Sequence, residues 1–504
     1  MPGHPPARPA LGLLVFVVGA ASLGAEIAAA RLLAPYFGAS TIIWANTIAT
    51  VLVALSAGYA LGGRLADRAP YMSRLCQLVL AAAVLLAAIP FVSAPLLRIA
   101  SKALGSLSVG GFFGSLLAVL ALVAVPVLLL GTVAPFAIRL SLARAEESGS
   151  VSGRLYALST VGSLVGTFLA ALVLIPFAGT HRTFLAFALA LAIVAVPGLS
   201  RRWSVAPLAL AILLALPPGG IDLHVAGSGR VVFETETPYQ YARVVEQPSG
   251  ERWLQLNEGV AVHSLYVPDS YLTGNYWDEF LVLPFAVHRE PPASIAILGD
   301  AAGTTARAYG HYFPRTAIDA VELDGQLTEV GRRFFGLSAR PQLHTITADA
   351  RPWLASVSRR YDAIFLDAYR QPYIPFYLAT REFFTLVRSH LRPGGMLVVN
   401  VGHPSGSDAL ERVISSTLRA VFSHVVRDPS EPTNTLLAAS TLPLTAQTLS
   451  SSAQALAADL RPIANACAAR LTPALRGGPV YTDDRAPVEW LVDESILGYA
   501  ASSH

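Results

Sequence analysis

Residues 294–303, with the sequence SIAILGDAAG, decide the fold of the C-terminal half of this chain. The apolar run 295–298 is typical of a short buried strand, and the turn 299–303 with its two glycines ends it. A helical stretch follows directly. Glycines at such a turn let the backbone approach a ligand closely, beside the N-terminus of the following helix. The segment therefore predicts the opening unit of a sheet that alternates with helices.

The alternation continues towards the C-terminus. Further strands are predicted at 317–323, 344–348, 363–366 and 396–401, with helices ending near 335 and 358 and a third over 380–390. Strands separated by helices pair in parallel, so we predict an α/β Rossmann-like domain over 291–504. Strand-like runs at 230–236, 242–247 and 253–257, broken by proline and glycine, predict a small β-rich segment within 218–290.

Acidic residues follow three successive strands of the predicted sheet. Glu322 ends the second strand, Asp349 follows the third and Asp367 follows the fourth. Ligands of such sheets bind at the carboxyl ends of the strands. A carboxylate at Glu322, with Asp324 nearby, can accept the hydroxyls of a ribose, and Asp349 can accept from an adenine amino group. Each acid alone can equally cap a loop or a helix, but together they predict an adenosine-type ligand.

The N-terminal half has the composition of a membrane domain. The whole chain of 504 residues is 53% apolar and only 14% charged, against about 25% charged in soluble proteins. A bilayer-spanning helix needs about 20 mostly apolar residues. Such runs lie at 10–31, 41–63, 75–97, 111–138, 156–178 and 183–199. We therefore predict a membrane domain over 1–217 with six transmembrane helices, and exclude a wholly water-soluble enzyme. Within it, Gly58, Gly62 and Gly63 predict a face for close helix packing.

Arginine in the short loops predicts the orientation of these helices. The loops assigned to the cytoplasm carry Arg64, Arg68, Arg74, Arg139, Arg144, Arg154, Arg201 and Arg202. This places the N-terminus in the cytoplasm of a multi-pass protein of the cell (inner) membrane. A seventh apolar run, 204–217, is short enough to lie in the interface, which keeps the soluble domain cytoplasmic. If that run spans the membrane instead, the soluble domain lies outside.

Other compositional signals exclude several classes of site. Two cysteines, Cys76 and Cys467, are too few for a disulfide framework or a cysteine-based metal site. The histidines lack metal-ligand spacing, so we expect no metal. A net charge of +3 gives no reason to expect nucleic acid.

Several motifs together resemble the spermidine synthase family of polyamine aminopropyltransferases, in particular its bacterial branch fused to a membrane domain. The soluble part carries TPYQ (237–240), LNEG (256–259), the 299–303 turn, VELD (321–324), ADA (348–350), YDAIFLD (361–367), LRPGG (391–395) and TDDRAPVE (482–489). In the membrane part, GAE (24–26) with Arg31, and residues 57–64, are similar to that branch. The family has a methyltransferase-type fold.

The resemblance implies a site for S-adenosylmethionine or its decarboxylated form as co-substrate, without a tightly bound cofactor. The residues implied to hold the donor are Gln240, Gly299, Asp300, Gly303, Glu322, Asp349 and Ala350. Asp367 is implied to act as general base when an amine such as putrescine attacks the carbon beside the sulfonium, releasing methylthioadenosine. Weaker implied contacts to the acceptor are Asp278, Glu279 and Tyr369. Expected partners are these small molecules and the lipid bilayer, with a homodimer left open.

The chain departs from the family mainly on the acceptor side. Ala302 stands where relatives carry an aspartate, and WDE (277–279) replaces a Tyr-His-Glu stretch. Further departures are YRQ (369–371) and EGVAVH (258–263). Three functions stay open at this point: aminopropyl transfer, another reaction of the sulfonium (methyl transfer or intramolecular displacement), and a transporter or channel whose soluble domain senses a nucleoside.

Overall fold

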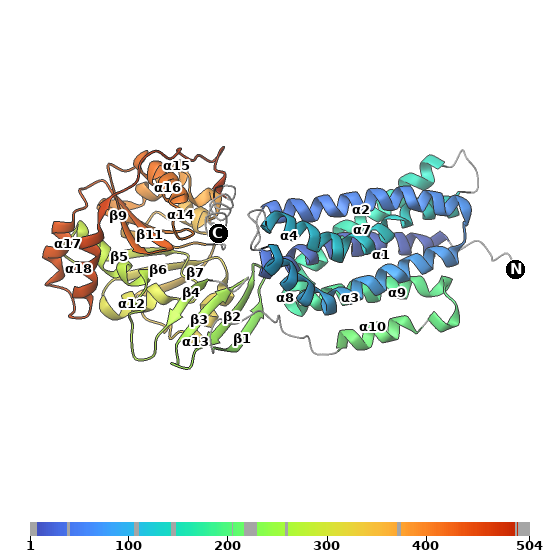
Figure 1. Ribbon diagram of the computed structural model, residues 1–504, viewed down its shortest axis with the longest axis horizontal. Coiled ribbons are helices and arrows are strands. Elements are labelled where there is room, and N and C mark those ends of the chain that lie inside the picture. Colours follow the sequence, from blue (N-terminus) through green and yellow to red (C-terminus); the bar gives the residue numbers. More distant parts are fainter. Residues whose placement is uncertain are drawn as a thin grey trace. The chain divides into compact units, whose positions relative to one another are not determined.

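The computed structural model describes residues 8–37, 41–104, 110–142, 148–203, 205–215, 229–257, 261–369, 374–488 and 491. The chain divides into two compact units. One comprises residues 1–223 together with 236–240, and the other comprises 224–235 together with 241–504. Figure 1 shows that the first is a bundle of helices and that the second combines strands with helices.

The helical unit consists of long helices, two of which are interrupted. Its helices are α1 (Arg8–Phe37), α2 (Thr41–Arg68), α3 (Met72–Leu104), α4 (Gly110–Val119), α5 (Val125–Gly131), α6 (Val133–Ser141), α7 (Ser148–Leu169), α8 (Ile175–Ala178), α9 (Thr180–Ala195) and α10 (Ala206–Ala215). Turns of π-helix at Leu120–Ala124 and Ala170–Leu174 join α4 to α5 and α7 to α8. A proline follows each π-turn, Pro126 and Pro176. Because proline lacks an N–H and crowds the carbonyl four residues back, the helix accommodates it by widening.

Six helical segments of the described chain are long and apolar enough to cross a membrane. They are Ala10–Leu33, Ile43–Arg68, Met72–Leu97, Phe113–Ser141, Ser148–Ala178 and Thr180–Gly198. These coincide with the six predicted runs to within a few residues at most ends. The start of the fifth helix differs more, because its first eight residues are too polar to belong to the predicted run. Of the predicted seventh run, α10 forms the middle, while 204, 216 and 217 lie outside the described residues.

Two of the three predicted packing glycines lie against a neighbouring helix. A Cβ at Gly58 would be 2.3 Å from the carbonyl oxygen of Leu128, and one at Gly62 would be 2.5 Å from that of Thr132. Helix α2 therefore contacts α5 and α6 at backbone distance. A Cβ at Gly63 meets no described atom within 4 Å. The prediction is thus wrong for Gly63, which falls one residue off the packed face of the helix.

The second unit contains a small and a large sheet. The small sheet has the order β1-β2-β3-β4, with β1 (Arg230–Glu236), β2 (Tyr241–Glu246), β3 (Arg252–Leu256) and β4 (Val262–Tyr266). Strand β4 is not among the predicted strands. It pairs antiparallel with β3. Side chains of the small sheet, among them Val244 and Leu254, pack with Leu327 and Val330 of α13 (Gly325–Phe334), so the small sheet covers this helix.

The large sheet has eight strands in the order β12-β10-β11-β9-β8-β5-β6-β7. Their bounds are β5 (Ser294–Leu298), β6 (Ala317–Glu322), β7 (Leu343–Thr347), β8 (Tyr361–Leu366), β9 (Leu391–Gly402), β10 (His424–Glu431), β11 (Asn434–Ser440) and β12 (Thr472–Pro473). The five strands from β9 to β7 pair in parallel, as predicted. Strands β11, β10 and β12 extend the sheet in antiparallel pairing, which the sequence analysis did not predict.

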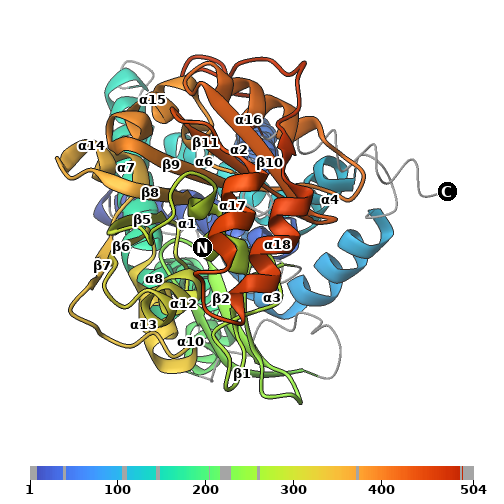
Figure 2. The same ribbon diagram turned by 90° about the vertical axis from the view of Figure 1, so that its left-hand side faces the viewer.

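Helices cover both faces of this sheet (Figure 2). Alternate residues of β5 point to opposite faces, as the pleat of a strand requires. Ile295 and Ile297 lie in the core shared with α12 (Thr304–Tyr312), α11 (Glu279–Val282), α17 (Ala446–Ala453) and α18 (Leu460–Arg470). Ala296 and Leu298 lie in the core shared with α14 (Ala350–Ser356), α15 (Arg381–Ser389) and α16 (Ala409–Arg419). The observed fold is therefore a helical region followed by an α/β domain of methyltransferase type, as predicted.

Candidate active site

The predicted site residues gather where the order of strands reverses. From β5 the chain runs outward through β6 and β7, then returns to β8 on the other side of β5. Such a reversal leaves a crevice at the carboxyl ends of the two central strands. The turn 299–303 follows β5, and Asp367 follows β8. The backbone N–H of Asp367 donates to the carbonyl oxygen of Leu298 at 2.9 Å, so both segments border this crevice.

The turn after β5 requires both of its glycines. Gly299 has φ +89°, and a Cβ there would be 2.6 Å from Cα of Ala368. Gly303 has φ +90° and precedes α12, and its Cβ would be 2.6 Å from the side chain of Leu337. Residues other than glycine rarely adopt such φ values. The turn therefore keeps the backbone beside Ala368, directly after the predicted base.

Glu322 connects this turn with the end of β6. One carboxylate oxygen accepts from the backbone N–H of Ala301 at 2.9 Å, and the other accepts from that of Asp324 at 2.9 Å. Desolvation raises the pKa of Glu322 to about 7. Asp324 itself caps α13 by accepting from the N–H of Gln326 at 3.2 Å. Of this pair, Glu322 faces the turn, whereas Asp324 has the capping role considered for it from sequence.

Asp300 is the second carboxylate at this edge of the sheet. It is only 7% exposed, and its carboxylate accepts a long hydrogen bond, 3.4 Å, from the N–H of Ala306. Desolvation raises the pKa of Asp300 well above its usual range, and the nearby carboxylates of Glu322 and Asp367 raise it further. Three acids thus converge on the crevice, an arrangement that attracts a cationic ligand.

Asp367 is the third carboxylate and is held by three donors. The hydroxyl of Tyr276 and the indole N–H of Trp277 donate to one oxygen, each at 3.1 Å. The side-chain amide of Asn400 donates to the other oxygen at 2.8 Å. Desolvation raises the pKa of Asp367 to about 6, while the three hydrogen bonds act in the opposite direction. A carboxylate with this pKa is ionised at neutral pH yet basic enough to accept a proton, which suits a general base.

Asp349 lies at the N-terminus of α14, next to buried Ala350. One of its oxygens accepts from the N–H of Arg351 at 3.1 Å, and the other accepts from the hydroxyl of Tyr377 at 2.8 Å. A carboxylate offers about four acceptor positions, so Asp349 retains capacity for a ligand N–H. Asp349 is therefore both a helix cap and a candidate ligand contact.

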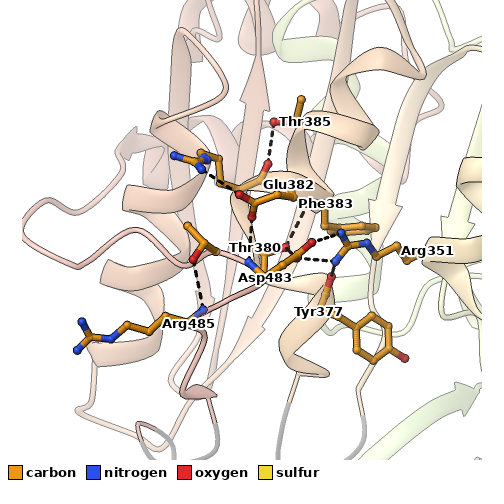
Figure 3. A network of polar contacts seen from close by, with 10 residues as sticks. Arg351, Tyr377, Thr380, Glu382, Phe383, Thr385, Asp483 and Arg485 are labelled. Carbon is orange, nitrogen blue, oxygen red and sulfur yellow. Dashed lines mark hydrogen bonds and ion pairs between the residues drawn. The ribbon is translucent and has the colours of Figure 1, made fainter.

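The closing TDD motif explains how α14 is anchored (Figure 3). The guanidinium of Arg351 donates to both carboxylate oxygens of Asp483, at 2.7 and 2.5 Å, and to the carbonyl oxygen of Tyr377 at 2.9 Å. The hydroxyl of Thr380 donates to Asp483 at 2.7 Å, and the N–H of Asp483 donates to Glu382 at 3.0 Å. The C-terminal segment thus ties α14 to α15 and positions Tyr377 beside Asp349.

Of the three weaker candidates, Tyr369 has a hydrogen bond beside the base, whereas the two acids are engaged in other contacts. The carboxylate of Asp278 accepts from the backbone N–H groups of Thr273 and Gly274 at 2.8–3.1 Å, which closes a loop. Glu279 forms an ion pair with Arg470 at 2.8 Å, in a separate charged cluster. The hydroxyl of Tyr369, by contrast, donates to the carbonyl oxygen of Asn400 at 2.9 Å, beside Asp367.

The remaining candidates lie elsewhere or outside the described chain. Gln240 ends a turn in which its own N–H donates to the Thr237 hydroxyl at 3.0 Å, and segment 236–240 groups with the helical unit. Its role in the site stays a prediction. Of the motifs quoted from sequence, residues 258–260, 370, 371 and 489 lie outside the described residues.

Residues that the sequence analysis did not assign complete the site. Tyr276, Trp277 and Asn400 hold the base, although Trp277 was noted only as a departure from the family. A signal for Asn400 was available, because a polar residue inside the apolar run 396–401 needs a buried partner. Ala302, at the family's acidic position, is fully buried, and its N–H donates to the hydroxyl of Ser264 at 2.9 Å.

Comparisons with known proteins identify the family that this part of the chain matches. Residues 279–439 match the family described as spermine/spermidine synthase domain. A probable polyamine aminopropyl transferase from Bifidobacterium longum is 36% identical over 195 residues, covering 38% of this chain and 43% of the relative. A polyamine aminopropyltransferase from Vibrio vulnificus is 32% identical over 180 residues, covering 34% and 59% respectively. The matches thus span about half the length of these curated relatives.

Among solved structures, a probable spermidine synthase from Corynebacterium glutamicum aligns with 51% of this chain and 98% of its own, at 21% identity and a TM-score of 0.39. The family resemblance stated from the motifs is confirmed by the matched segment 279–439.

Proposed function

Because residues 279–439 carry a spermine/spermidine synthase domain, we propose that this protein is a polyamine aminopropyltransferase. It transfers the aminopropyl group of decarboxylated S-adenosylmethionine to an amine such as putrescine and releases methylthioadenosine. The observation that carries the proposal is Asp367, a desolvated carboxylate at the strand-order reversal, with Asp300 and Glu322 close by.

The reaction needs one proton acceptor. The lone pair of the neutral amine attacks the carbon beside the sulfonium, the C–S bond breaks, and its electron pair goes to sulfur, which leaves as a neutral thioether. The nitrogen becomes positively charged and passes a proton to Asp367. The sulfonium is already an activated leaving group and needs no acid to depart. The ionised carboxylate also stabilises the positive charge near the reacting carbon.

The adenosine part of the donor is assigned to the other strand ends. Glu322 accepts the ribose hydroxyls, since each of its oxygens keeps a free acceptor position beside its backbone hydrogen bond. Asp349 accepts from the adenine amino group, with Ala350 against the ring and Tyr377 fixing the carboxylate. Gly299 and Gly303 give the ligand access to the backbone, and Gln240 contacts the thioadenosine.

Asp300 distinguishes the decarboxylated donor from S-adenosylmethionine. The decarboxylated donor ends in a bare ammonium group, whereas S-adenosylmethionine also carries a carboxylate. Asp367 is ionised at neutral pH, and the neighbouring carboxyl groups of Asp300 and Glu322 ionise more readily beside a cation, so an ammonium is attracted and a further carboxylate is repelled. In this chain Asp300 takes the part of the acid that relatives carry at the position of Ala302, because the latter is buried in the core.

The protein is proposed to act at the cell (inner) membrane, as a multi-pass protein with its soluble domain in the cytoplasm. Six apolar helical segments of sufficient length support the first part. The arginine-rich loops around Arg64, Arg139 and Arg201 support the orientation. The domain limits 1–217, 218–290 and 291–504 stay predictions, as does a homodimer.

The test is an assay of the full chain in detergent with either sulfonium donor, with and without putrescine, followed by mass spectrometry. We expect methylthioadenosine and spermidine from the decarboxylated donor only when putrescine is present. Asp367→Asn should lose turnover but still bind the donor, whereas Asp362→Asn, at the opposite end of β8, should retain turnover. Methylthioadenosine from S-adenosylmethionine without amine would instead support intramolecular displacement. Binding without any product would support the nucleoside sensor.

A further inference from the structure

We propose that Asn434, at the start of β11, is a positioning residue that sets the base strength of Asp367 by fixing the side-chain amide of Asn400. The proposal rests on the function proposed above and adds a residue on an antiparallel strand that no sequence motif includes. Asn434 donates to Asn400, which in turn donates to Asp367, so it acts on the base through Asn400.

Three hydrogen bonds form a directed chain of side chains across neighbouring strands. The hydroxyl of Thr433 donates to Asn434 Oδ1 at 3.1 Å, and Asn434 Nδ2 donates to Asn400 Oδ1 at 2.9 Å. Asn400 Nδ2 then donates to Asp367 Oδ1 at 2.8 Å. The order β11-β9-β8 places the three segments side by side, with Leu436 opposite Asn400.

The direction of this chain follows from chemistry. An ionised carboxylate only accepts hydrogen bonds, so Asn400 must present its NH₂ group to Asp367. The two ends of an asparagine amide are nearly equal in size, so shape alone does not select this orientation. Asn434 reinforces the orientation that the carboxylate requires, because its NH₂ group donates to the oxygen at the other end of the Asn400 amide. Asn400 is 3% exposed, and hydrogen bonds in such a poorly solvated place are electrostatically strong.

The same end of the β10–β11 pair also supports a second donor to the base. Glu431, the register partner of Asn434, accepts from the backbone N–H of Tyr276 at 2.8 Å. Tyr276 in turn donates its hydroxyl to Asp367 at 3.1 Å. Two independent contacts therefore connect this end of the antiparallel strands with the base.

Other titratable groups facing Asp367 are few among the residues described. Asp300 follows β5, Tyr276 precedes α11 and Tyr369 follows β8, with Glu322 and Glu431 one contact further away. Asn434→Ala alters none of these groups and adds no charge, whereas Asn434→Asp adds a carboxylate that itself raises the pKa of Asp367. A shift in the pH dependence of turnover that both variants share therefore reports the orientation of Asn400.

The decisive variant is Asn434→Asp, which keeps the size of the side chain but removes its NH₂ group. A carboxylate there accepts from Asn400 Nδ2 and so turns the oxygen of Asn400 towards Asp367. The acid limb of kcat/KM should move to higher pH by about one unit, a roughly tenfold loss at acid pH that shrinks as the pH rises. Asn434→Ala should shift the limb in the same direction by less, and neither variant should change the KM of the donor.

Ser430→Ala is the matched control. The Ser430 hydroxyl, near the end of β10, donates to the backbone carbonyl of Asn434 at 3.2 Å and so leaves the Asn434 side chain untouched. Its pH profile should equal that of the wild type. A uniform loss at every pH in Asn434→Asp, or a lower melting temperature with an unmoved profile, would assign Asn434 a merely structural role and overturn the proposal.

The failure of the proposed function is distinguishable from the failure of this inference. If the wild type releases no methylthioadenosine from either donor, the proposed function fails. The titration of Asp367 is then followed through the pH dependence of tryptophan emission, because the indole N–H of Trp277 donates to Asp367. Emission of Trp277→Phe gives the blank to subtract. If Asn434→Asp and Asn434→Ala both raise the pH midpoint of this emission change, the proposed role of Asn434 is supported. An unchanged midpoint refutes it.

Discussion

Trp277→Phe offers the sharpest test of how the base is tuned. The substitution preserves an aromatic ring but removes one of the three donors to Asp367. A hydrogen bond to a charged group contributes about 1.5–3 kcal/mol, and one pKa unit corresponds to about 1.4 kcal/mol. Losing a donor that favours the ionised form raises the pKa. We therefore expect the pKa of Asp367 to rise from about 6 by at least one unit.

The expected loss of activity depends on pH in a defined way. At pH 6 about half of the wild-type carboxylate is ionised, against about a tenth in the variant, which gives a roughly fivefold lower kcat/KM. At pH 9 both are ionised and the two activities should agree. The acceptor amine also titrates, but identically for both proteins, so it cancels when variant and wild type are compared as a ratio.

The assay follows methylthioadenosine release by the full chain in detergent from pH 5 to pH 9, with decarboxylated S-adenosylmethionine and putrescine. Trp253→Phe, in β3 of the small sheet, is the matched control and should give a ratio near one at every pH. A ratio for Trp277→Phe that stays constant across the pH range would refute the assignment of Asp367 as the titrating base.

Further predictions concern the charge of the site, its anchoring and the helix bundle. Asp300→Asn should abolish turnover yet raise the melting temperature. Since the folded-state pKa of Asp300 is raised, its ionisation costs stability above the unfolded pKa, so the gain should grow as the pH rises above about 4 and vanish as the pH falls below it. Asp483→Asn frees Arg351 and should raise the KM of the donor severalfold, with kcat nearly unchanged in steady-state kinetics. Gly62→Val should lower the yield of folded protein in detergent, measured by size-exclusion chromatography, because a Cβ there lies 2.5 Å from a backbone oxygen. Gly63→Val should be tolerated, and equal behaviour of the two would refute the packing described for α2.

The parts of the structure that sequence predicts are those set by local patterns. The parallel strands follow from short apolar runs, and Glu322, Asp349 and Asp367 follow from their places directly after those runs. The six apolar helices follow from length and composition alone.

The parts that escape prediction depend on pairing between distant segments. Strands β10 and β11 include charged and polar residues at both ends, so their pattern does not mark them as sheet, yet they bring Asn434 beside Asn400. Likewise, Tyr276 reaches Asp367 only because the chain folds back over 91 residues. Gly63 lies off the packed face because of how α2 is rotated about its axis. The positions of the glycines in the sequence do not determine that rotation.

The convergence of Asp300, Glu322 and Asp367 also bears on how a catalytic cycle ends. In the proposed reaction, the sulfonium donor enters with positive charge that these carboxylates attract. The thioether left after transfer is neutral, and the ammonium group departs with the polyamine. The nucleoside product thus loses the electrostatic part of its affinity at the step that creates it. The reaction therefore lowers the affinity of the site for its own nucleoside product. We expect much tighter binding of sulfonium than of thioether ligands, and little product inhibition.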